Sequence, residues 1–457
     1  MPDESPNPVA TNIRSEEPSL ARRLGTFDAT MIVMGGIIGA GIFVNPSVVA
    51  QRVHTSSLVI CVWLIGGLIA LIGAFVYAEL AALRPGIGGQ YAYLRDAYHP
   101  MVAFLYGWTL LLVVQTGGMA GAAIIFGRYF RELSGWGLPE QVTATLALLI
   151  LTVINCFGVR AGSNVQNALM ITKVAAIALL ILAGLSTARA PATISHLSNG
   201  TSGLAEFGAA MVPVIFAYGG WQTATFVSGE MRDPTRNLPK GLFLGVSGVI
   251  ILYLLVNYAC LRVLGLGGLA ATLTPASEVM GRAWPGVGAK LIACGIAIST
   301  VGFLSQSILT APRVYYAMAR DRVFFRTVGH LDRRTKAPVM AIILQGVWAA
   351  IVALTGKYEQ ILNYVVTIDV LFFGLTGASL FVFRARARRE NVASGHFARV
   401  PLHPITTSLF VVTCWAVAVS TLVQYPKNAG IGVAILALGA LIYPLWHSRA
   451  TPGKAKD

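Results

Sequence analysis

A run of glycines interrupts the first long apolar segment of the chain. Gly35, Gly36, Gly39 and Gly41 fall within seven residues, with Ala40 between the last two. Each glycine costs a helix interior about 1 kcal/mol relative to alanine, so a helix is expected to break here. The first amides of the half-helix that follows carry partial positive charge and have no acceptor. The amides of Gly39, Ala40 and Gly41 are therefore candidate donors to an anion such as a carboxylate.

Two other interpretations of this run compete with a broken helix. A phosphate-binding glycine loop needs a preceding strand and a soluble nucleotide fold, which the surrounding apolar sequence does not offer. A close helix-packing face is compatible with Gly35 and Gly39, which are four residues apart.

A second glycine pair interrupts another apolar segment about 180 residues later. Pro213 precedes the sequence Phe216-Ala217-Tyr218-Gly219-Gly220-Trp221. Carbonyls freed by unwinding need donors at membrane depth, and an ammonium group supplies up to three. One donor-rich break and one acceptor-rich break fit the two ends of a zwitterionic amino acid. A proline and glycine kink that serves packing alone is the alternative.

Lys173 lies several residues inside an apolar segment, where a lysine is costly. Snorkelling to the interface or a static structural tie is one interpretation. The other is a functional ammonium facing unwound backbone, which either exchanges protons or occupies a place where other transporters hold Na⁺.

Few other polar residues lie inside the apolar segments. Asp369 is the only acid deep within one, whereas Glu79 and Glu230 lie near segment ends, where pairing with arginine is the simpler interpretation. No acid lies within either break, which favours neutral substrates. The remaining candidates for a polar pocket or for helix–helix hydrogen bonds are Gln115, Thr116, Gln222, Thr223, Ser299, Ser305 and Gln306.

The composition indicates a polytopic helical membrane protein. The chain has 457 residues, is 55% hydrophobic and only 12% charged, against about 25% charged in soluble domains. Its net charge of +15 does not indicate nucleic-acid binding, because lysine and arginine cluster in alternate loops. The five cysteines lie in apolar segments without a CxxC pair, so neither a metal site, a cofactor nor a disulfide framework is expected.

Twelve apolar segments are long enough to span a bilayer. They are predicted at 27–50, 57–83, 101–127, 141–158, 164–186, 206–230, 240–264, 287–318, 338–355, 359–383, 405–424 and 429–447. Their connecting loops place 24 lysines and arginines on one side and 9 on the other. This bias predicts a multi-pass cell-membrane protein with both termini in the cytoplasm.

The two breaks fall at corresponding places in two halves, which is typical of inverted-repeat transporters with a site at the membrane midplane. The predicted organisation is a disordered tail at 1–23, a first repeat at 24–186, a second repeat at 206–384, two appended helices at 405–447 and a C-terminal tail at 448–457.

The sequence resembles the amino acid–polyamine–organocation superfamily, and most of all its L-type amino acid transporter branch. Four motifs carry the resemblance: Gly39-Ala40-Gly41-Ile42-Phe43, Pro85 through Gly88-Gly89-Gln90-Tyr91, Phe216 through Trp221 with Glu230 through Pro239, and Arg313 with Ala319-Arg320-Asp321. The resemblance implies an all-α polytopic membrane protein with twelve transmembrane helices, a five-plus-five inverted repeat (the LeuT-like fold) and discontinuous helices 1 and 6.

The resemblance also implies roles for particular residues. Backbone amides of the first break would hold the substrate carboxylate, and carbonyls of both breaks would hold its amino group. Phe216 would act as a gate, and Lys173 would replace Na⁺, which implies sodium-independent transport. The implied substrate site comprises Ile37, Gly39, Ala40, Gly41, Phe216, Ala217, Tyr218, Gly219 and Gln222.

The sequence departs from the family pattern at several positions. Ala40 replaces a serine, so no hydroxyl helps to hold the carboxylate. Gln222-Thr223 replaces a frequent Asn-Tyr, and Gly229 replaces the first residue of a frequent Glu-Glu pair. The loop between the third and fourth segments has no cysteine, so no disulfide-linked accessory subunit is expected.

The predicted function is secondary transport of neutral L-amino acids by alternating access, through exchange or proton symport. An amino acid sensor without net transport, or a transporter of another amine such as a polyamine, would share much of the pocket. An intramembrane enzyme would need converging acids, bases or metal ligands, and a channel would need a continuous polar lining. The apolar segments provide neither.

Overall fold

The computed structural model describes residues 24–84, 88–157, 162–189, 203–332, 337–389 and 399–450. Every named element in these residues is a helix, and their one β-type contact is an isolated bridge between Leu24 and Met231. The fold is therefore all-α, as predicted. The predicted N-terminal tail and residues 451–457 lie outside the described residues.

The helices follow one another along the chain. In chain order they are α1 Thr26–Ile37, α2 Gly41–Ala50, α3 Ser56–Leu83, α4 Gln90–Ala97, α5 Pro100–Thr109, the π-helix η1 Leu110–Val114, α6 Gln115–Ser134, α7 Glu140–Cys156, α8 Gly162–Ser186, α9 Gly203–Tyr218, the 3₁₀-helix η2 Trp221–Glu230, α10 Pro234–Ala271, α11 Pro275–Ala283, α12 Gly288–Thr310, α13 Pro312–Arg320, the 3₁₀-helix η3 Arg326–Gly329, α14 Val339–Thr355, α15 Tyr358–Arg389, α16 Ile405–Gln424 and α17 Pro426–Ala450.

Proline marks the start of several of these helices. Pro100, Pro234, Pro275 and Pro312 are the first residues of α5, α10, α11 and α13. A first-turn residue needs no amide donor, and the fixed φ of proline suits this position. The α3 helix begins instead with a side-chain cap, because the Thr55 hydroxyl accepts a hydrogen bond from the Leu58 amide.

The apolar segments predicted from the sequence coincide with these helices. Among the described residues, eight helical segments are long and apolar enough to cross a membrane, and α1 with α2 passes the same test as a pair bent by 44°. The α7 and α14 helices are apolar but shorter, at 17 residues each. The predicted segment 206–230 contains most of α9 and all of η2. The fold is that of a multi-pass membrane protein.

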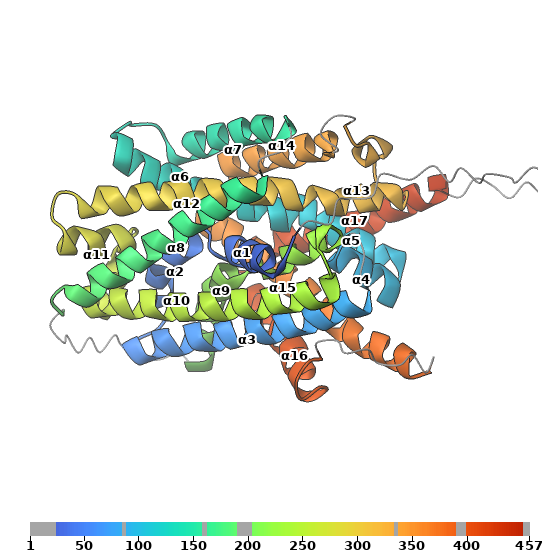
Figure 1. Cartoon of the computed structure of the whole chain (residues 1–457), viewed down its shortest axis with the longest axis horizontal. Helices are drawn as coiled ribbons and strands as arrows, with labels where there is room; N and C mark the ends of the chain where they lie inside the picture. Colours follow the sequence, from blue (N-terminus) through green and yellow to red (C-terminus); the bar gives the residue numbers. More distant parts are fainter. Residues whose placement is uncertain are drawn as a thin grey trace, which may run out of the picture.

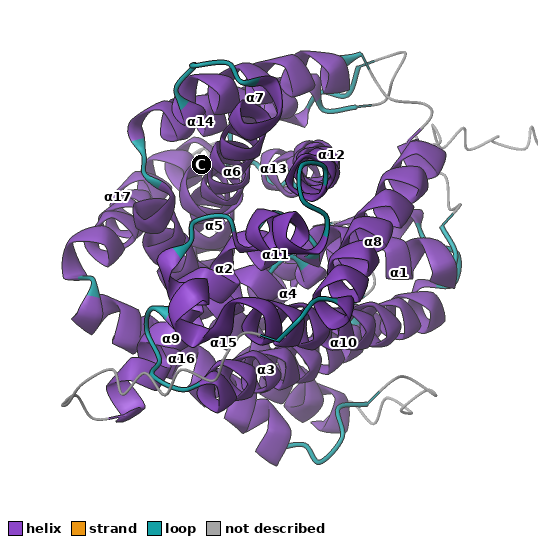
Figure 2. Cartoon of the chain, turned by 90° about the vertical axis from the view of Figure 1, so that its left-hand side faces the viewer, coloured by secondary structure: helices purple, strands orange, loops and turns teal. Residues whose placement is uncertain are grey.

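The two interrupted helices lie inside the bundle. Figure 1 shows α3, α10 and α12 along the long axis of the molecule, with α8 running obliquely from α10 to α12. The α1 helix packs against α8, α10, α12 and η2, and α9 packs against α2, α3, α15 and α16. Seen from the end in Figure 2, α7 and α14 lie side by side at one edge of the bundle. Both breaks are therefore surrounded by other helices.

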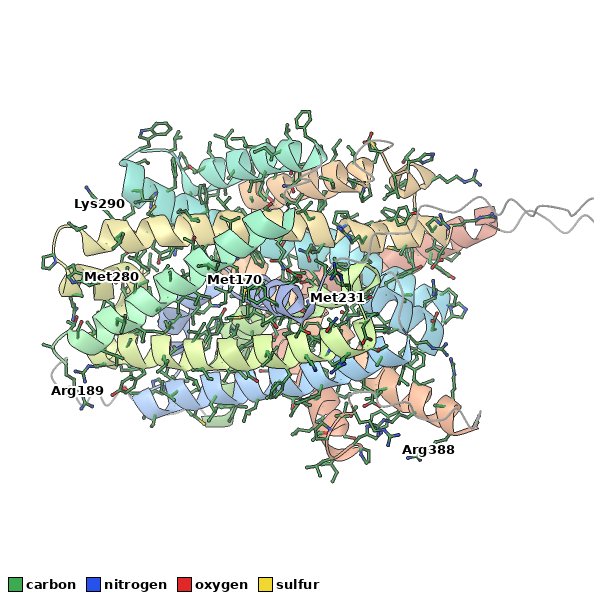
Figure 3. The ribbon with its side chains drawn as sticks, viewed as in Figure 1. Met170, Arg189, Met231, Met280, Lys290 and Arg388 are labelled. Carbon is green, nitrogen blue, oxygen red and sulfur yellow. The ribbon has the colours of Figure 1, made fainter. Side chains whose placement is uncertain are left out.

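Three of the basic residues in the charge count mark the two ends of the molecule. Figure 3 shows Arg189 and Lys290 at one end and Arg388 at the other. The long helices run between these ends, so the two breaks lie between them.

Candidate functional site

The two helix breaks touch each other through glycine backbone. A Cβ atom on Gly36 would lie 2.6 Å from the carbonyl oxygen of Gly220, and one on Gly220 would overlap the carbonyl of Gly36. Gly220 also has a φ of 106°, a conformation that side chains other than glycine rarely adopt. The contact between the unwound segments therefore requires glycine on both sides.

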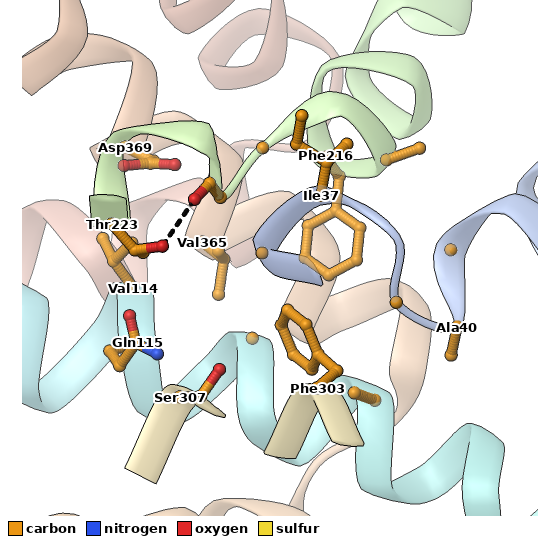
Figure 4. A pocket seen from close by; sticks show the side chains of 18 of the residues that line it. Ile37, Ala40, Val114, Gln115, Phe216, Thr223, Phe303, Ser307, Val365 and Asp369 are labelled. Carbon is orange, nitrogen blue, oxygen red and sulfur yellow. Dashed lines mark hydrogen bonds between the residues drawn. The ribbon is translucent and has the colours of Figure 1, made fainter. Parts of the chain in front are cut away.

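A cavity lies where the breaks meet. Figure 4 shows it between the break of α1, the break of α9 and the side chains of α12. It is lined by Gly36, Ile37, Gly39, Ala40, Gly41, Val114, Gln115, Gly118, Ala122, Ile125, Ile215, Phe216, Ala217, Gly219, Gly220, Gln222, Thr223, Phe303, Gln306, Ser307, Thr310, Val365, Val366 and Asp369. Eight of the nine residues predicted for the substrate site are in this lining.

The ninth residue, Tyr218, faces away from this cavity. Its ring packs against those of Trp63 and Tyr253, with centroids 5.8 and 5.1 Å apart. Successive residues of a helix point about 100° apart, so Tyr218 points to α3 and α10 while Ala217 faces the cavity. A second, apolar pocket holds Tyr218 between α3, α15 and α16.

The donor side of the first break lies at the start of α2. The amide of Gly39 donates to the carbonyl oxygen of Ile37 at 2.8 Å, so this predicted donor already has an acceptor. Ala40 and Gly41 stand at the beginning of α2, where amides have no acceptor within the helix. An anion in the cavity would meet these two amides.

The acceptor side involves a residue that the sequence did not indicate. Tyr253 on α10 is fully buried, and its hydroxyl lies 3.1 Å from the carbonyl oxygen of Ile37 and 3.2 Å from that of Ala217. The Phe216 carbonyl accepts from the amide of Gly219 at 3.2 Å. A carbonyl oxygen has two lone pairs, so each can accept a further donor. Tyr253 thus joins the two unwound segments.

Lys173 lies behind the first break and outside the cavity lining. Its ammonium nitrogen donates to the carbonyl oxygens of Gly35 at 3.3 Å and Ile38 at 3.0 Å, and the residue is fully buried. None of the ion pairs recorded among the described residues includes it. Lys173 therefore binds backbone carbonyls at the end of α1, a contact that a static structural tie and a functional ammonium would share.

Comparison with known proteins identifies the family of this chain. The family model described as amino acid permease matches residues 24–442. This chain belongs to the amino acid permease family. Its relatives also place it in the amino acid–polyamine–organocation superfamily, close to the L-type branch, as the motifs predicted. The family consists of transporters, not enzymes.

Three relatives illustrate the similarity of this permease. It is 30% identical to the serine/threonine exchanger SteT of Bacillus subtilis over 94% of this chain and 98% of the relative. It is 29% identical to the human large neutral amino acids transporter small subunit 2, over 93% and 80% of the two chains. It is 30% identical to the human b(0,+)-type amino acid transporter 1, over 82% and 79%.

The permease holds Phe216, the predicted gate, in a cluster that joins three helices. The Phe216 and Tyr358 rings meet edge to face, with centroids 6.2 Å apart. The Tyr358 hydroxyl donates to the side-chain oxygen of Asn45 at 2.9 Å, and the Asn45 amide donates to the Pro213 carbonyl at 2.8 Å. Through Phe216 this cluster adjoins the cavity, while Asn45 and Tyr358 lie outside its lining. Asn45 and Tyr358 are 313 residues apart, so no local signal could pair them.

The polar residues of the permease divide between the cavity and the helix contacts. Gln115, Gln222, Thr223 and Gln306 line the cavity, whereas Thr116, Ser299 and Ser305 do not. The Thr116 hydroxyl donates to the Leu111 carbonyl at 2.7 Å, across the wide turn of η1. This π-helix was not predicted, and it immediately precedes the cavity residue Gln115.

Glu79 pairs with arginine, as expected for an acid near a segment end. It binds the guanidinium of Arg384 through two contacts of 2.7 Å and accepts the amide of Val400 at 2.7 Å. The side chain of Glu230 lies outside the described residues. Asp369, in contrast, lines the cavity.

Proposed function

We propose that this permease carries neutral L-amino acids across the cell membrane by sodium-independent alternating access. Its membership of the amino acid permease family establishes amino acid transport. The observation that carries the finer proposal is the meeting of the two breaks in one cavity, with helix-start amides on one side and carbonyls on the other. An amino acid zwitterion offers its carboxylate to the amides and its ammonium group to the carbonyls.

The α-carboxylate would bind the amides of Ala40 and Gly41 at the start of α2. A helix N-terminus stabilises an anion through its free donors and partial positive charge. Because residue 40 is alanine, backbone amides act without a hydroxyl. The amino group would bind the carbonyls of Ile37, Phe216, Ala217 and Gly219 through lone pairs that Tyr253 and the Gly219 amide leave open.

Sodium independence is supported by the contacts of Lys173. Its ammonium already donates to the carbonyls of Gly35 and Ile38, so a positive charge is present at these oxygens without a sodium ion. We expect replacement of Na⁺ by choline to leave uptake unchanged. We also expect Lys173→Ala to abolish transport or its pH dependence, while Lys290→Ala, at an exposed helix start, transports normally. Unchanged uptake by Lys173→Ala at every pH would assign the lysine a structural role.

Alternating access in this proposal uses twelve spans with a five-plus-five inverted repeat, residues 24–186 and 206–384, and both termini in the cytoplasm. Corresponding breaks in α1 with α2 and in α9 with η2 support the repeat. The cluster of Asn45, Phe216 and Tyr358 would close the cavity on the extracellular side. The chain would act without a disulfide-linked subunit, since the loop between α6 and α7 has no cysteine.

The test is transport by the purified protein in liposomes. For an exchanger, uptake of labelled amino acid should be faster when unlabelled amino acid is preloaded inside. For a proton symporter, a pH gradient should drive uptake into vesicles without preloaded substrate. A competition panel of the twenty amino acids then defines the substrate range. Binding without counterflow would indicate a sensor instead, and failure of every amino acid in both formats would refute the proposal.

A further inference from the structure

Asp369 gives the cavity an ionisable carboxyl group that a neutral amino acid does not use. It lies on α15 and is the only ionisable side chain among the residues that line the cavity. Val365 and Val366, which precede it by four and three residues, line the same cavity. This spacing places all three on one face of α15, so the carboxylate belongs to the cavity wall.

The surrounding residues leave this carboxylate without a partner. Among the described residues, no hydrogen bond or ion pair is recorded for Asp369. The nearby Thr223 hydroxyl donates its single proton to the Gly220 carbonyl at 2.7 Å, so it cannot serve the acid. Lys173 donates to the carbonyls behind the first break and is not in the lining. A carboxylate at membrane depth without compensation is costly, so this group either binds a proton or pairs with a cation from outside the chain.

The position of Asp369 relative to the breaks indicates which substrate atoms could reach it. Figure 4 shows Asp369 and Thr223 at one end of the cavity and Ala40 at the other, with Ile37 and Phe216 between them. A substrate carboxylate at Ala40 therefore lies far from Asp369, and the amino group lies between. Only a side chain that extends from the Cα atom could approach the acid.

The wall beside this path has room for a long side chain. A Cβ atom added at Gly118 on α6 would meet nothing within 4 Å, although Gly118 lines the cavity. Gln115, one turn earlier on the same helix, adds a polar side chain to this end of the cavity.

We propose that Asp369 forms a subsite for the cationic side chain of the substrate, so that this permease also accepts amino acids such as arginine and lysine. The inference rests on the proposed function, because the backbone sites at Ala40 and Ile37 orient the substrate. A zwitterion leaves the carboxylate uncompensated, whereas an ammonium or guanidinium group neutralises it through a charge-assisted hydrogen bond.

The experiment compares arginine with citrulline, its neutral analogue of similar shape. Both compete in proteoliposomes against the labelled neutral amino acid with the highest uptake among the twenty. In the wild type, arginine should inhibit at a concentration at least about tenfold lower than citrulline, since one desolvated charge pair contributes 1.4 kcal/mol or more. Asp369→Asn should still take up neutral amino acids, but arginine should no longer inhibit this uptake more strongly than citrulline. Thr376→Val, two turns along α15 and outside the cavity lining, is the matched control and should preserve the stronger inhibition by arginine.

Each alternative has its own outcome. Equal inhibition by arginine and citrulline in the wild type would overturn the inference, even if Asp369→Asn failed to fold. Asp369→Asn could instead leave the ratio of the inhibitory concentrations of citrulline and arginine unchanged and lose the uptake driven by a pH gradient. That result would also overturn the inference and make Asp369 a proton site. Agmatine, which is arginine without its carboxylate, should inhibit poorly. If agmatine matched arginine, the carboxylate site of the proposed function would fail while the cation subsite remained.

Discussion

At the scale of single residues, the Tyr253 hydroxyl contacts a carbonyl oxygen of each unwound segment. Its hydroxyl lies within hydrogen-bonding distance of Ile37 and Ala217, which are proposed to hold the amino group of the substrate. Tyr253→Phe removes the hydrogen bond that holds the two unwound segments together, a loss of about 0.5–1.5 kcal/mol, and so leaves their carbonyls less well placed for the amino group. We expect the KM for amino acid to rise roughly tenfold, because 1.4 kcal/mol corresponds to one factor of ten.

Tyr258→Phe is the control for this prediction, since Tyr258 lies on the same helix with 51% of its surface exposed. It should leave both KM and thermal stability unchanged. A lower melting temperature of Tyr253→Phe with an unaltered KM would mean that the hydroxyl only stabilises the fold.

We expect substitutions at the adjacent glycines Gly117 and Gly118 to have different effects. A side chain at Gly118 would enter open cavity space, whereas one at Gly117 would collide with Val365 of α15. Gly118→Val should therefore narrow the substrate range, with alanine and serine still transported and leucine and phenylalanine excluded. Competition against a small labelled amino acid measures this range.

Gly117→Ala should instead lower the melting temperature and reduce the uptake of all substrates together. If Gly118→Val reduced the uptake of small and large substrates equally, Gly118 would not form the proposed cavity wall.

At the scale of elements, the segment before α16 is fixed to α3 and α15 by charge. Glu79 holds Arg384 and the Val400 amide, and His403 lies close by, in contact with the Thr407 hydroxyl at 2.9 Å. Burial, followed by the positive charges of Arg384 and Arg388, lowers the pKa of His403 below its usual value.

This pKa shift gives the expected direction of the pH dependence. The unfolded chain binds a proton at His403 more readily than the folded chain, so stability rises with pH up to the ordinary histidine pKa of about 6.5. The contribution is present above that pH and is lost as the pH falls towards the lower pKa of the folded state. The melting temperature should therefore fall between pH 7 and pH 5, and His403→Gln should reduce this fall. An identical pH profile in the variant would exclude His403 as its source.

Also at this scale, the sequence predicted both breaks but few of their partners. Glycine and proline act locally, so Gly35–Gly41 and Gly219-Gly220 identify the breaks without any knowledge of the fold. Asn45, Tyr253 and Tyr358 act through contacts between distant helices, and a uniformly apolar segment does not reveal which face points inward. The π-helix at Leu110–Val114 lacks glycine and proline and was missed for the same reason.

At the scale of the whole molecule, the arrangement of charge sets an orientation that can be tested. Arg189 and Lys290 lie at one end of the bundle and Arg388 at the other, and the loops divide 24 basic residues from 9. The more basic side of a membrane protein faces the cytoplasm. Since α15 runs from Tyr358 to Arg389, its beginning and the cluster over Phe216 would then face outwards.

Thiol labelling in intact cells tests this orientation. The five native cysteines are first replaced by alanine, and a single cysteine is introduced as Lys290→Cys or Arg388→Cys. A membrane-impermeant maleimide should label the Lys290 variant in intact cells and the Arg388 variant only after permeabilisation. The reverse pattern would invert the orientation and place the Asn45, Phe216 and Tyr358 cluster on the cytoplasmic side of the cavity. Transport of amino acid by each variant is the control for correct folding, because both positions lie at the ends of the bundle, far from the two breaks.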